Sequence, residues 1–166
     1  DVTRLAGVLR QDADLTTRFR LEREAGAGGM GKVFAAVDRV TGRPVAIKLL
    51  DRLAGGDIAR FGAEAAILER LEHPAIVSYV AHGITSDGRP YLAMSWLDGE
   101  TLASRLQRGP LALAEAVDMG ARVAAALVYL HGLGIVHRDI KPSNVFLVGG
   151  DPRAATVIDL GIAKQL

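Results

Sequence analysis

The sequence predicts an α+β fold in which a β-rich segment with one helix precedes a mostly helical segment. Between residues 19 and 50, apolar side chains recur at the period of two that is typical of strands. Between residues 113 and 131, they recur at the spacing of an amphipathic helix. Of the 166 residues, 49% are hydrophobic and 23% are charged, which is the composition of a folded globular protein.

Charge and cysteine content exclude several classes of function. The 20 lysines and arginines nearly balance the 19 aspartates and glutamates. The chain therefore has no large excess of positive charge that would attract nucleic acids or anionic membranes, and we expect no nucleic-acid partner. The absence of cysteine excludes disulfide bonds and thiolate metal sites. No apolar run approaches the roughly 20 residues of a membrane span. We therefore expect a cytoplasmic location, with any membrane anchor elsewhere in a longer parent chain.

The first fifty residues predict a short extension and a three-stranded antiparallel meander. Residues 1–17 are expected to form an N-terminal helix or linker. A strand starts near Phe19 and runs into the glycine cluster at 26–31. The next strand is expected to place Val33, Ala35 and Val37 on its apolar face, opposite an imperfect polar face. A turn at Thr41-Gly42 leads to a largely buried third strand.

Later elements follow from the same patterns. Pro74 bars the first helix from continuing, and Asp98-Gly99 is expected to break the chain between the two segments. In chain order we predict a helix over 58–71, strands over 76–81 and 91–96, a short helix over 101–108, a long helix over 113–131, and strands over 145–148 and 156–158. The two predicted lobes are thus residues 18–96 and 97–166. The apolar side of the long helix should pack on helices beyond residue 166. This side consists of Val117, Ala121, Ala124, Leu127, Val128 and Leu130.

The glycine cluster allows several interpretations. Residues 26–32 fit the first seven places of the phosphate loop of nucleotide-hydrolysing proteins, but Val33 stands where that loop needs serine or threonine. The spacing of Gly26, Gly28 and Gly31 also fits the dinucleotide fingerprint, which must open a helix. A glycine-rich hairpin over nucleotide phosphates needs strands on both sides and a valine after the last glycine. On the pattern alone, a merely structural turn has even odds.

Three further motifs narrow the choice. They are Val45-Ala46-Ile47-Lys48, then His137-Arg138-Asp139 followed by Lys141 and Asn144, and finally Asp159-Leu160-Gly161. From about Phe19 to Leu166 the chain resembles the eukaryotic-type serine/threonine protein kinases, with the composition of a bacterial member. The resemblance implies a two-lobe protein-kinase-like fold, with a five-stranded antiparallel N-lobe carrying one regulatory helix. It also implies an incomplete helical C-lobe, cut at the start of the activation segment.

The resemblance also implies roles for residues of the second lobe. Asp139 would accept the proton of the substrate hydroxyl or orient that hydroxyl, and Lys141 would screen charge on the transferred phosphoryl group. Asn144 and Asp159 would hold Mg²⁺, with Mn²⁺ as a possible substitute. Lysine two places after the aspartate is more similar to serine/threonine than to tyrosine kinases. Leu160 replaces a phenylalanine and supplies packing only.

In the first lobe the resemblance implies a nucleotide site. Lys48 would bind the α- and β-phosphates of ATP and pair with Glu64 from the regulatory helix. Met94 would lie behind the base, and Ser95 stands where many relatives have glutamate. The full set of expected nucleotide contacts, including Phe146 from the second lobe, is Ala25, Gly26, Ala27, Gly28, Gly29, Met30, Gly31, Lys32, Val33, Ala46, Lys48, Met94, Ser95, Leu97 and Phe146.

The resemblance thus implies an enzyme that transfers the γ-phosphoryl group of ATP to serine or threonine hydroxyls of protein substrates. The parent chain is expected to carry further domains, and these residues alone could be inactive. One alternative is a nucleotide-binding regulatory module without catalysis. Another is a small-molecule phosphotransferase, against which the complete glycine loop and the Arg138/Lys141 pattern speak.

Overall fold

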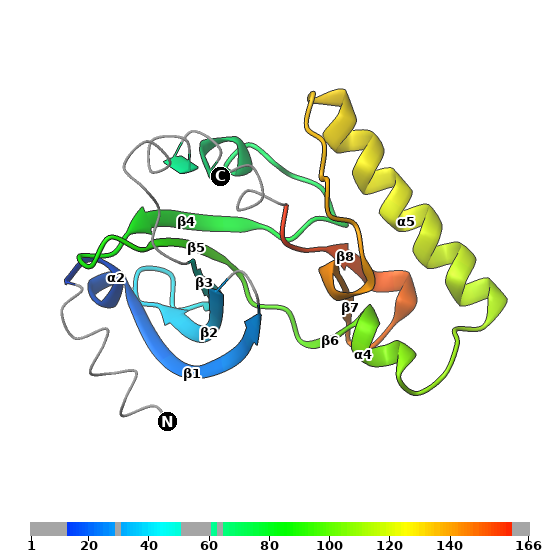
Figure 1. Cartoon of the computed structure of the whole chain (residues 1–166), viewed down its shortest axis with the longest axis horizontal. Coiled ribbons are helices and arrows are strands. Elements are labelled where there is room, and N and C mark those ends of the chain that lie inside the picture. Colours follow the sequence, from blue (N-terminus) through cyan, green and yellow to red (C-terminus); the bar gives the residue numbers. More distant parts are fainter. Residues whose placement is uncertain (1–12, 29–30, 51–60, 63–64, 161–166) are drawn as a thin grey trace. The chain divides into compact units, whose positions relative to one another are not determined.

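A computed structural model describes residues 13–28, 31–50, 61–62 and 65–160. They form two sheets and several helices (Figure 1). In chain order the elements are α2 (Ala13–Arg18), β1 (Phe19–Gly28), β2 (Gly31–Asp38), β3 (Pro44–Leu49), β4 (Tyr79–Ile84), β5 (Pro90–Ser95), β6 (Gly99–Thr101), α4 (Leu102–Leu106), α5 (Leu113–Gly132), η1 (Pro142–Asn144), β7 (Val145–Val148), η2 (Pro152–Ala154) and β8 (Ala155–Val157).

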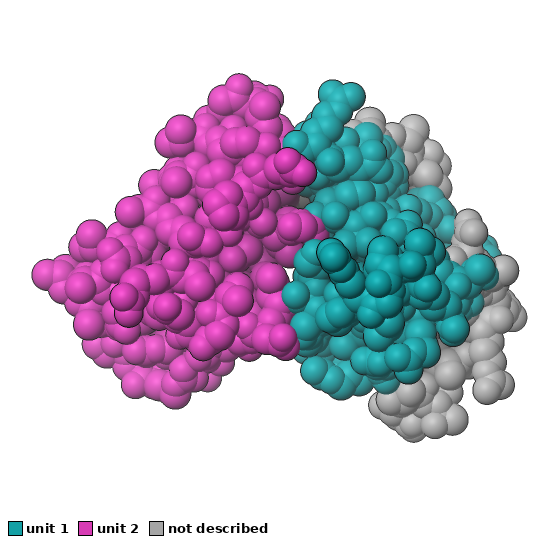
Figure 2. Space-filling model, turned by 180° about the vertical axis from the view of Figure 1, so that it is seen from behind, with its two compact units in different colours: residues 1–70, 79–96, 162–166 teal, residues 71–78, 97–161 magenta. Residues whose placement is uncertain are grey.

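The chain divides into two compact units, teal and magenta in Figure 2. The first contains the described residues up to Arg70 together with Tyr79–Trp96. The second contains Leu71–Ser78 and the described residues from Leu97 onward. The short segment 71–78 therefore belongs with the second unit, although the residues on both sides of it belong to the first.

A five-stranded antiparallel sheet forms the first unit, in the order β1-β2-β3-β5-β4. The predicted meander and five-stranded sheet are confirmed. Residues 61–62 and 65–68 are helical, within the helix predicted over 58–71. The rest of that prediction falls partly outside the described residues, and the helix gives way to a turn at 69–70, before Pro74.

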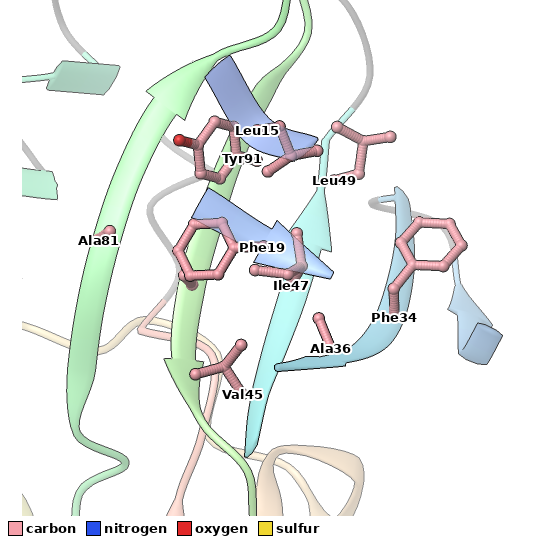
Figure 3. Close-up of a cluster of buried hydrophobic side chains, with 10 residues drawn as sticks. Leu15, Phe19, Phe34, Ala36, Val45, Ile47, Leu49, Ala81 and Tyr91 are labelled. Atoms are coloured by element: carbon pink, nitrogen blue, oxygen red, sulfur yellow. The ribbon is translucent and has the colours of Figure 1, made fainter. Parts of the chain in front are cut away.

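The core of the first unit lies on one face of this sheet (Figure 3). Phe19 meets the ring of Tyr91 edge-on, with centroids 6.2 Å apart. Leu15 of α2 is buried in the same cluster, so residues assigned to an extension from the sequence pack against the sheet. On β2 the cluster takes Phe34 and Ala36, the opposite alternation from the one predicted. Because Ala35 is buried too, the middle of β2 is covered on both faces and has no solvent face of the kind that the prediction assumed.

Asp38 at the end of β2 is a fully buried acidic residue. Its Oδ2 accepts a hydrogen bond from the Arg18 guanidinium at 3.2 Å, and its Oδ1 accepts one from the Val40 amide at 3.0 Å. Burial raises the pKa of Asp38, but the bonds from Arg18 and Val40 outweigh it and hold the pKa below its ordinary value. The carboxylate therefore joins α2 to the β2–β3 turn as a charged group.

We expect Asp38→Ala to lower the free energy of unfolding of the full-length protein by about 2 kcal/mol, because it leaves Arg18 without its partner. The loss is limited because the Arg18 side chain is partly exposed to solvent. Because the folded-state pKa lies below the unfolded value of 3.8, the stabilisation is complete above that value. It is lost as pH falls through the folded-state pKa. Urea unfolding at a series of pH values measures both effects. Asp151→Asn, at a half-exposed carboxylate, is the matched control, and an equal loss there would contradict the assignment.

The second unit has a three-stranded antiparallel sheet, in the order β6-β7-β8. Its core contains Leu102, Leu147 and Ala155, with Met119 and Val123 of α5 packed against it. The predicted strand 145–148 is confirmed, and the one expected at 156–158 lies one residue earlier. The break predicted at Asp98-Gly99 lies at residues 96–98 instead, because Gly99 pairs with Val148 as the first residue of β6. Gly99 has a φ of 141°, and a Cβ there would lie 2.1 Å from the Leu147 carbonyl oxygen. A glycine that signals a turn in the sequence here permits close strand contact.

The long helix α5 is confirmed. On its predicted apolar side Leu130 is buried, whereas Val117 and Val128 are 60% and 71% exposed. The exposed valines agree with a side that was expected to pack on further helices, and that packing stays a prediction. None of the helices in the described residues is long and apolar enough to cross a membrane.

The strand predicted over 76–81 is displaced. β4 begins only at Tyr79, and Ile76 instead forms an isolated parallel bridge with Val157 of β8. The amide of Val77 donates to the Val157 carbonyl at 3.0 Å, and the amide of Val157 donates to the Ala75 carbonyl at 2.8 Å. These partners lie far along the chain, so the apolar pattern at 76–78 could not reveal them.

Candidate active site

Three of the residues predicted to act in catalysis or metal binding meet in the loop after α5. Oδ2 of Asp139 lies 2.9 Å from Nζ of Lys141 and accepts a hydrogen bond from Nδ2 of Asn144 at 3.0 Å. The same Asn144 nitrogen donates to the backbone carbonyl of Asp139 at 2.9 Å. The Asp139 side chain is 11% exposed. One oxygen of a nearly buried carboxylate is therefore held between an ammonium and an amide, which fixes the direction of the group.

The backbone at this aspartate is unusual. Arg138 has a φ of 61°, in the left-handed region that costs energy for residues with a side chain. The neighbouring His137 is buried, and its Nδ1 accepts a hydrogen bond from the Asp139 amide at 3.3 Å. Burial lowers the pKa of His137, because desolvation disfavours the charged ring. A neutral imidazole can act as this acceptor, so His137 supports the loop rather than the chemistry.

Asn144 and Asp159, the predicted metal ligands, are linked through the backbone. The carbonyl of Asn144 accepts a hydrogen bond from the Ile158 amide at 3.0 Å, and Asp159 follows with a φ of 61°. Both side-chain hydrogen bonds of Asn144 use its nitrogen, so they do not compete with a cation for the amide oxygen. An amide oxygen and a carboxylate are hard ligands of the kind that Mg²⁺ prefers. Since the described residues contain no group of three His, Cys, Asp or Glu side chains able to hold a metal, phosphate oxygens or water would have to complete the set.

In the first unit, the glycine-rich segment joins β1 to β2. Gly28 pairs with Gly31, and the two strands run antiparallel. Gly31 has a φ of 122°, and a Cβ there would lie 2.0 Å from the Leu49 carbonyl oxygen. Because a strand follows the glycines, the phosphate-loop and dinucleotide interpretations fail, since both need a helix at this point. The hairpin interpretation agrees with these strands.

Lys48 is 8% exposed in the middle of the sheet. Its register partners are Val33 on β2 and Leu92 on β5. Two residues earlier on β3, Ala46 lies opposite Met94. A lysine this deeply buried needs compensation for its charge, so its position in an apolar strand is not explained by packing alone.

The predicted site residues divide between the two units. Nucleotide contacts expected in the first unit lie on β1, β2, β3 and β5, while Leu97 precedes β6 and half-buried Phe146 is on β7 in the second. Glu64, Gly29, Met30 and Gly161 lie outside the described residues, so the expected pairing of Lys48 with Glu64 stays a prediction. Glu24 had no role assigned from the sequence, and it accepts a hydrogen bond from Nζ of Lys32 at 3.3 Å across the hairpin. Glu24 lies opposite Phe34 in the register, two residues from Lys32, so the pairing of β1 with β2 brings the two charges close together.

Comparison with known proteins decides the family. The model of the protein kinase domain family matches residues 19–166. The chain belongs to this family. This kinase domain is 40% identical over 165 residues to the serine/threonine-protein kinase PknA of Mycobacterium tuberculosis, covering 95% of the present chain and 38% of PknA. It is 38% identical over 154 residues to the serine/threonine-protein kinase pkn2 of Myxococcus xanthus, covering 90% of the chain and 18% of that protein.

Solved structures agree with the family. The kinase domain of Mycobacterium tuberculosis PknI matches with a TM-score of 0.75 and 30% identity, over 87% of this chain and 60% of that one. A structure of Rad53 residues 1–466 in complex with AMP-PNP matches with a TM-score of 0.79 and 25% identity, over 89% of this chain and 39% of that one. The predicted protein-kinase fold class is confirmed. The chain spans less than two thirds of each of these proteins.

Proposed function

We propose that the protein containing this kinase domain transfers the γ-phosphoryl group of ATP to serine or threonine hydroxyls of protein substrates. The observation that carries the proposal is the Asp139 carboxylate held between Lys141 and Asn144. A fixed carboxylate can accept a proton from a hydroxyl nucleophile or orient it, and the adjacent ammonium can offset charge on the phosphoryl group. Lys141, together with the similarity to the serine/threonine-protein kinases PknA and pkn2, favours serine and threonine over tyrosine.

The remaining chemistry is assigned to the nucleotide and its cation. Asn144 and Asp159 would hold Mg²⁺, or Mn²⁺, which when bound would neutralise charge on the phosphates. Lys48 would bind the α- and β-phosphates, and the hairpin of β1 and β2 would offer backbone amides to them. Gly31 supports this role, because its φ of 122° needs a residue without a side chain.

The test is a transfer assay on the full-length protein, with ATP labelled in the γ-phosphate, Mg²⁺ and myelin basic protein as a general acceptor. We expect label on the acceptor or on the kinase itself, and acid hydrolysis should release phosphoserine or phosphothreonine. Label on tyrosine would contradict the specificity. Nucleotide binding without transfer would favour a regulatory module that binds nucleotide without catalysis, and the complete set of Lys48, Asp139, Asn144 and Asp159 argues against that module.

A further inference from the structure

Arg122 on α5 makes two hydrogen bonds that the proposed reaction does not use. Its Nε donates to the backbone carbonyl of Ala155 at 2.8 Å, and a terminal guanidinium nitrogen donates to the backbone carbonyl of Pro74 at 2.7 Å. Ala155 begins β8, whereas Pro74 lies in the segment 71–78. All three residues belong to the second unit. One side chain thus joins two backbone segments that lie 81 positions apart in the sequence, as the residue numbers show.

The two carbonyls mark the place where a short parallel ladder stops. Val157 exchanges bonds with Ala75 and Val77. Because alternate residues of a strand direct their backbone groups to the same side, the next bond would run from the amide of Ala75 to the carbonyl of Ala155. That amide instead donates to Nδ1 of His73 at 3.1 Å. The carbonyl of Ala155 accepts its hydrogen bond from Nε of Arg122 rather than from the Ala75 amide. Arg122 therefore ends the ladder and fixes its register.

A second residue of α5 holds the same segment. Tyr129 lies about two helical turns after Arg122, on the same side of the helix. Its hydroxyl accepts a hydrogen bond from the Glu72 amide at 3.1 Å, and its ring stacks on His73 with centroids 5.2 Å apart. Tyr129 touches only segment 71–78 in these contacts, whereas Arg122 also reaches β8. Of these polar contacts, Arg122 therefore makes the one that joins α5 to β8, in addition to the apolar packing of Met119 and Val123.

β8 leads directly to the predicted metal ligands. Only Ile158 lies between Val157 and Asp159, and its amide donates a hydrogen bond to the carbonyl of Asn144. We propose that Arg122 is a positioning residue that keeps β8 in register and so sets the geometry of Asn144 and Asp159 toward a divalent cation. This inference rests on the proposed function, because it takes these two residues as the cation's ligands. Arginine suits the task, since its planar guanidinium offers donors in fixed directions, whereas lysine has one nitrogen on a flexible stem.

The test uses the full-length protein with AMP-PNP and Mn²⁺, whose free concentration is followed by electron paramagnetic resonance. We expect Arg122→Ala to raise the dissociation constant for Mn²⁺ on the order of tenfold. Arg122→Lys should restore part of the affinity. Arg153→Ala is the matched control, because that arginine lies beside β8 with its side chain 72% exposed, and it should bind Mn²⁺ like the wild type.

A merely structural role for Arg122 predicts lower thermal stability with unchanged Mn²⁺ affinity in the folded protein, and that result overturns the inference. If Arg122→Ala does not fold, Arg122→Lys carries the test, and wild-type affinity in that variant likewise overturns it. Failure of the proposed function is separate, because there the wild type itself would bind no Mn²⁺ with nucleotide or transfer no phosphate. Circular dichroism of each variant establishes that only folded protein is compared.

Discussion

Asp139→Asn is expected to reduce phosphate transfer on the order of a thousandfold while the protein stays folded. An amide keeps the size of the carboxylate and one acceptor oxygen, but it is a far weaker base. Lys141 and Asn144 both direct donors at Oδ2 of Asp139, so one of them can still be satisfied by the amide oxygen. The charge that fixes Lys141 is lost. The measurement is the rate of label transfer from ATP at saturating substrate, alongside thermal unfolding.

Asp151→Asn is the matched control for this substitution. That aspartate belongs to the same unit, and its side chain is 50% exposed and paired with an exposed arginine. Surface ion pairs of this kind contribute little, so the control should retain wild-type transfer and stability. Full transfer in Asp139→Asn would remove the proposed base. A large loss of stability in Asp139→Asn would instead assign Asp139 a structural role in the loop.

The spacing of apolar residues predicted the helices and strands, because this spacing depends only on residues close together in the sequence. The strands around Val45 and the helix α5 are long enough for their spacing to be unambiguous. The prediction of which residues of β2 face the core was wrong. Phe34 and Ala35 are buried on opposite faces, so no polar side distinguishes the core face from the other. The strand predicted to begin at Ile76 was misplaced, because Ile76 pairs with Val157, a residue far along the chain that a local pattern does not reveal. Gly99 was misjudged because close strand contact and a turn both favour glycine.

The candidate site was predictable to different extents in its two parts. Asp139, Lys141 and Asn144 lie within six residues of one another, so one loop brings them together, and their motif is recognisable without any knowledge of the sheet. Their hydrogen-bond geometry was not predictable, because it depends on the left-handed backbone at Arg138. Arg122 gave no signal at all. Arginine on an amphipathic helix ordinarily faces water, and its two carbonyl partners are set by tertiary structure alone.

Lys48→Met is expected to reduce transfer by roughly 10²–10³-fold while the protein stays folded. Methionine approximates the length of the lysine stem and fills the same place between Val33 and Leu92, but it carries no charge for a phosphate. Lys48 is 8% exposed, so the substitution removes the burial cost of its ammonium together with the interactions of that charge. We expect the variant to stay folded, and the free energy of unfolding is measured beside the rate of transfer. Affinity for ATP and the rate at saturating ATP are measured separately.

Arg43→Met is the matched control, because it removes a positive charge from an exposed position before the same strand. It should leave transfer unchanged, which separates the site of Lys48 from the general charge of the sheet. A wild-type rate in Lys48→Met would show that its burial serves the fold alone. A marked fall in stability would point the same way, because it would mean that the ammonium holds the sheet together through partners of its own. Only lost transfer with retained stability connects the buried lysine to the phosphates of ATP.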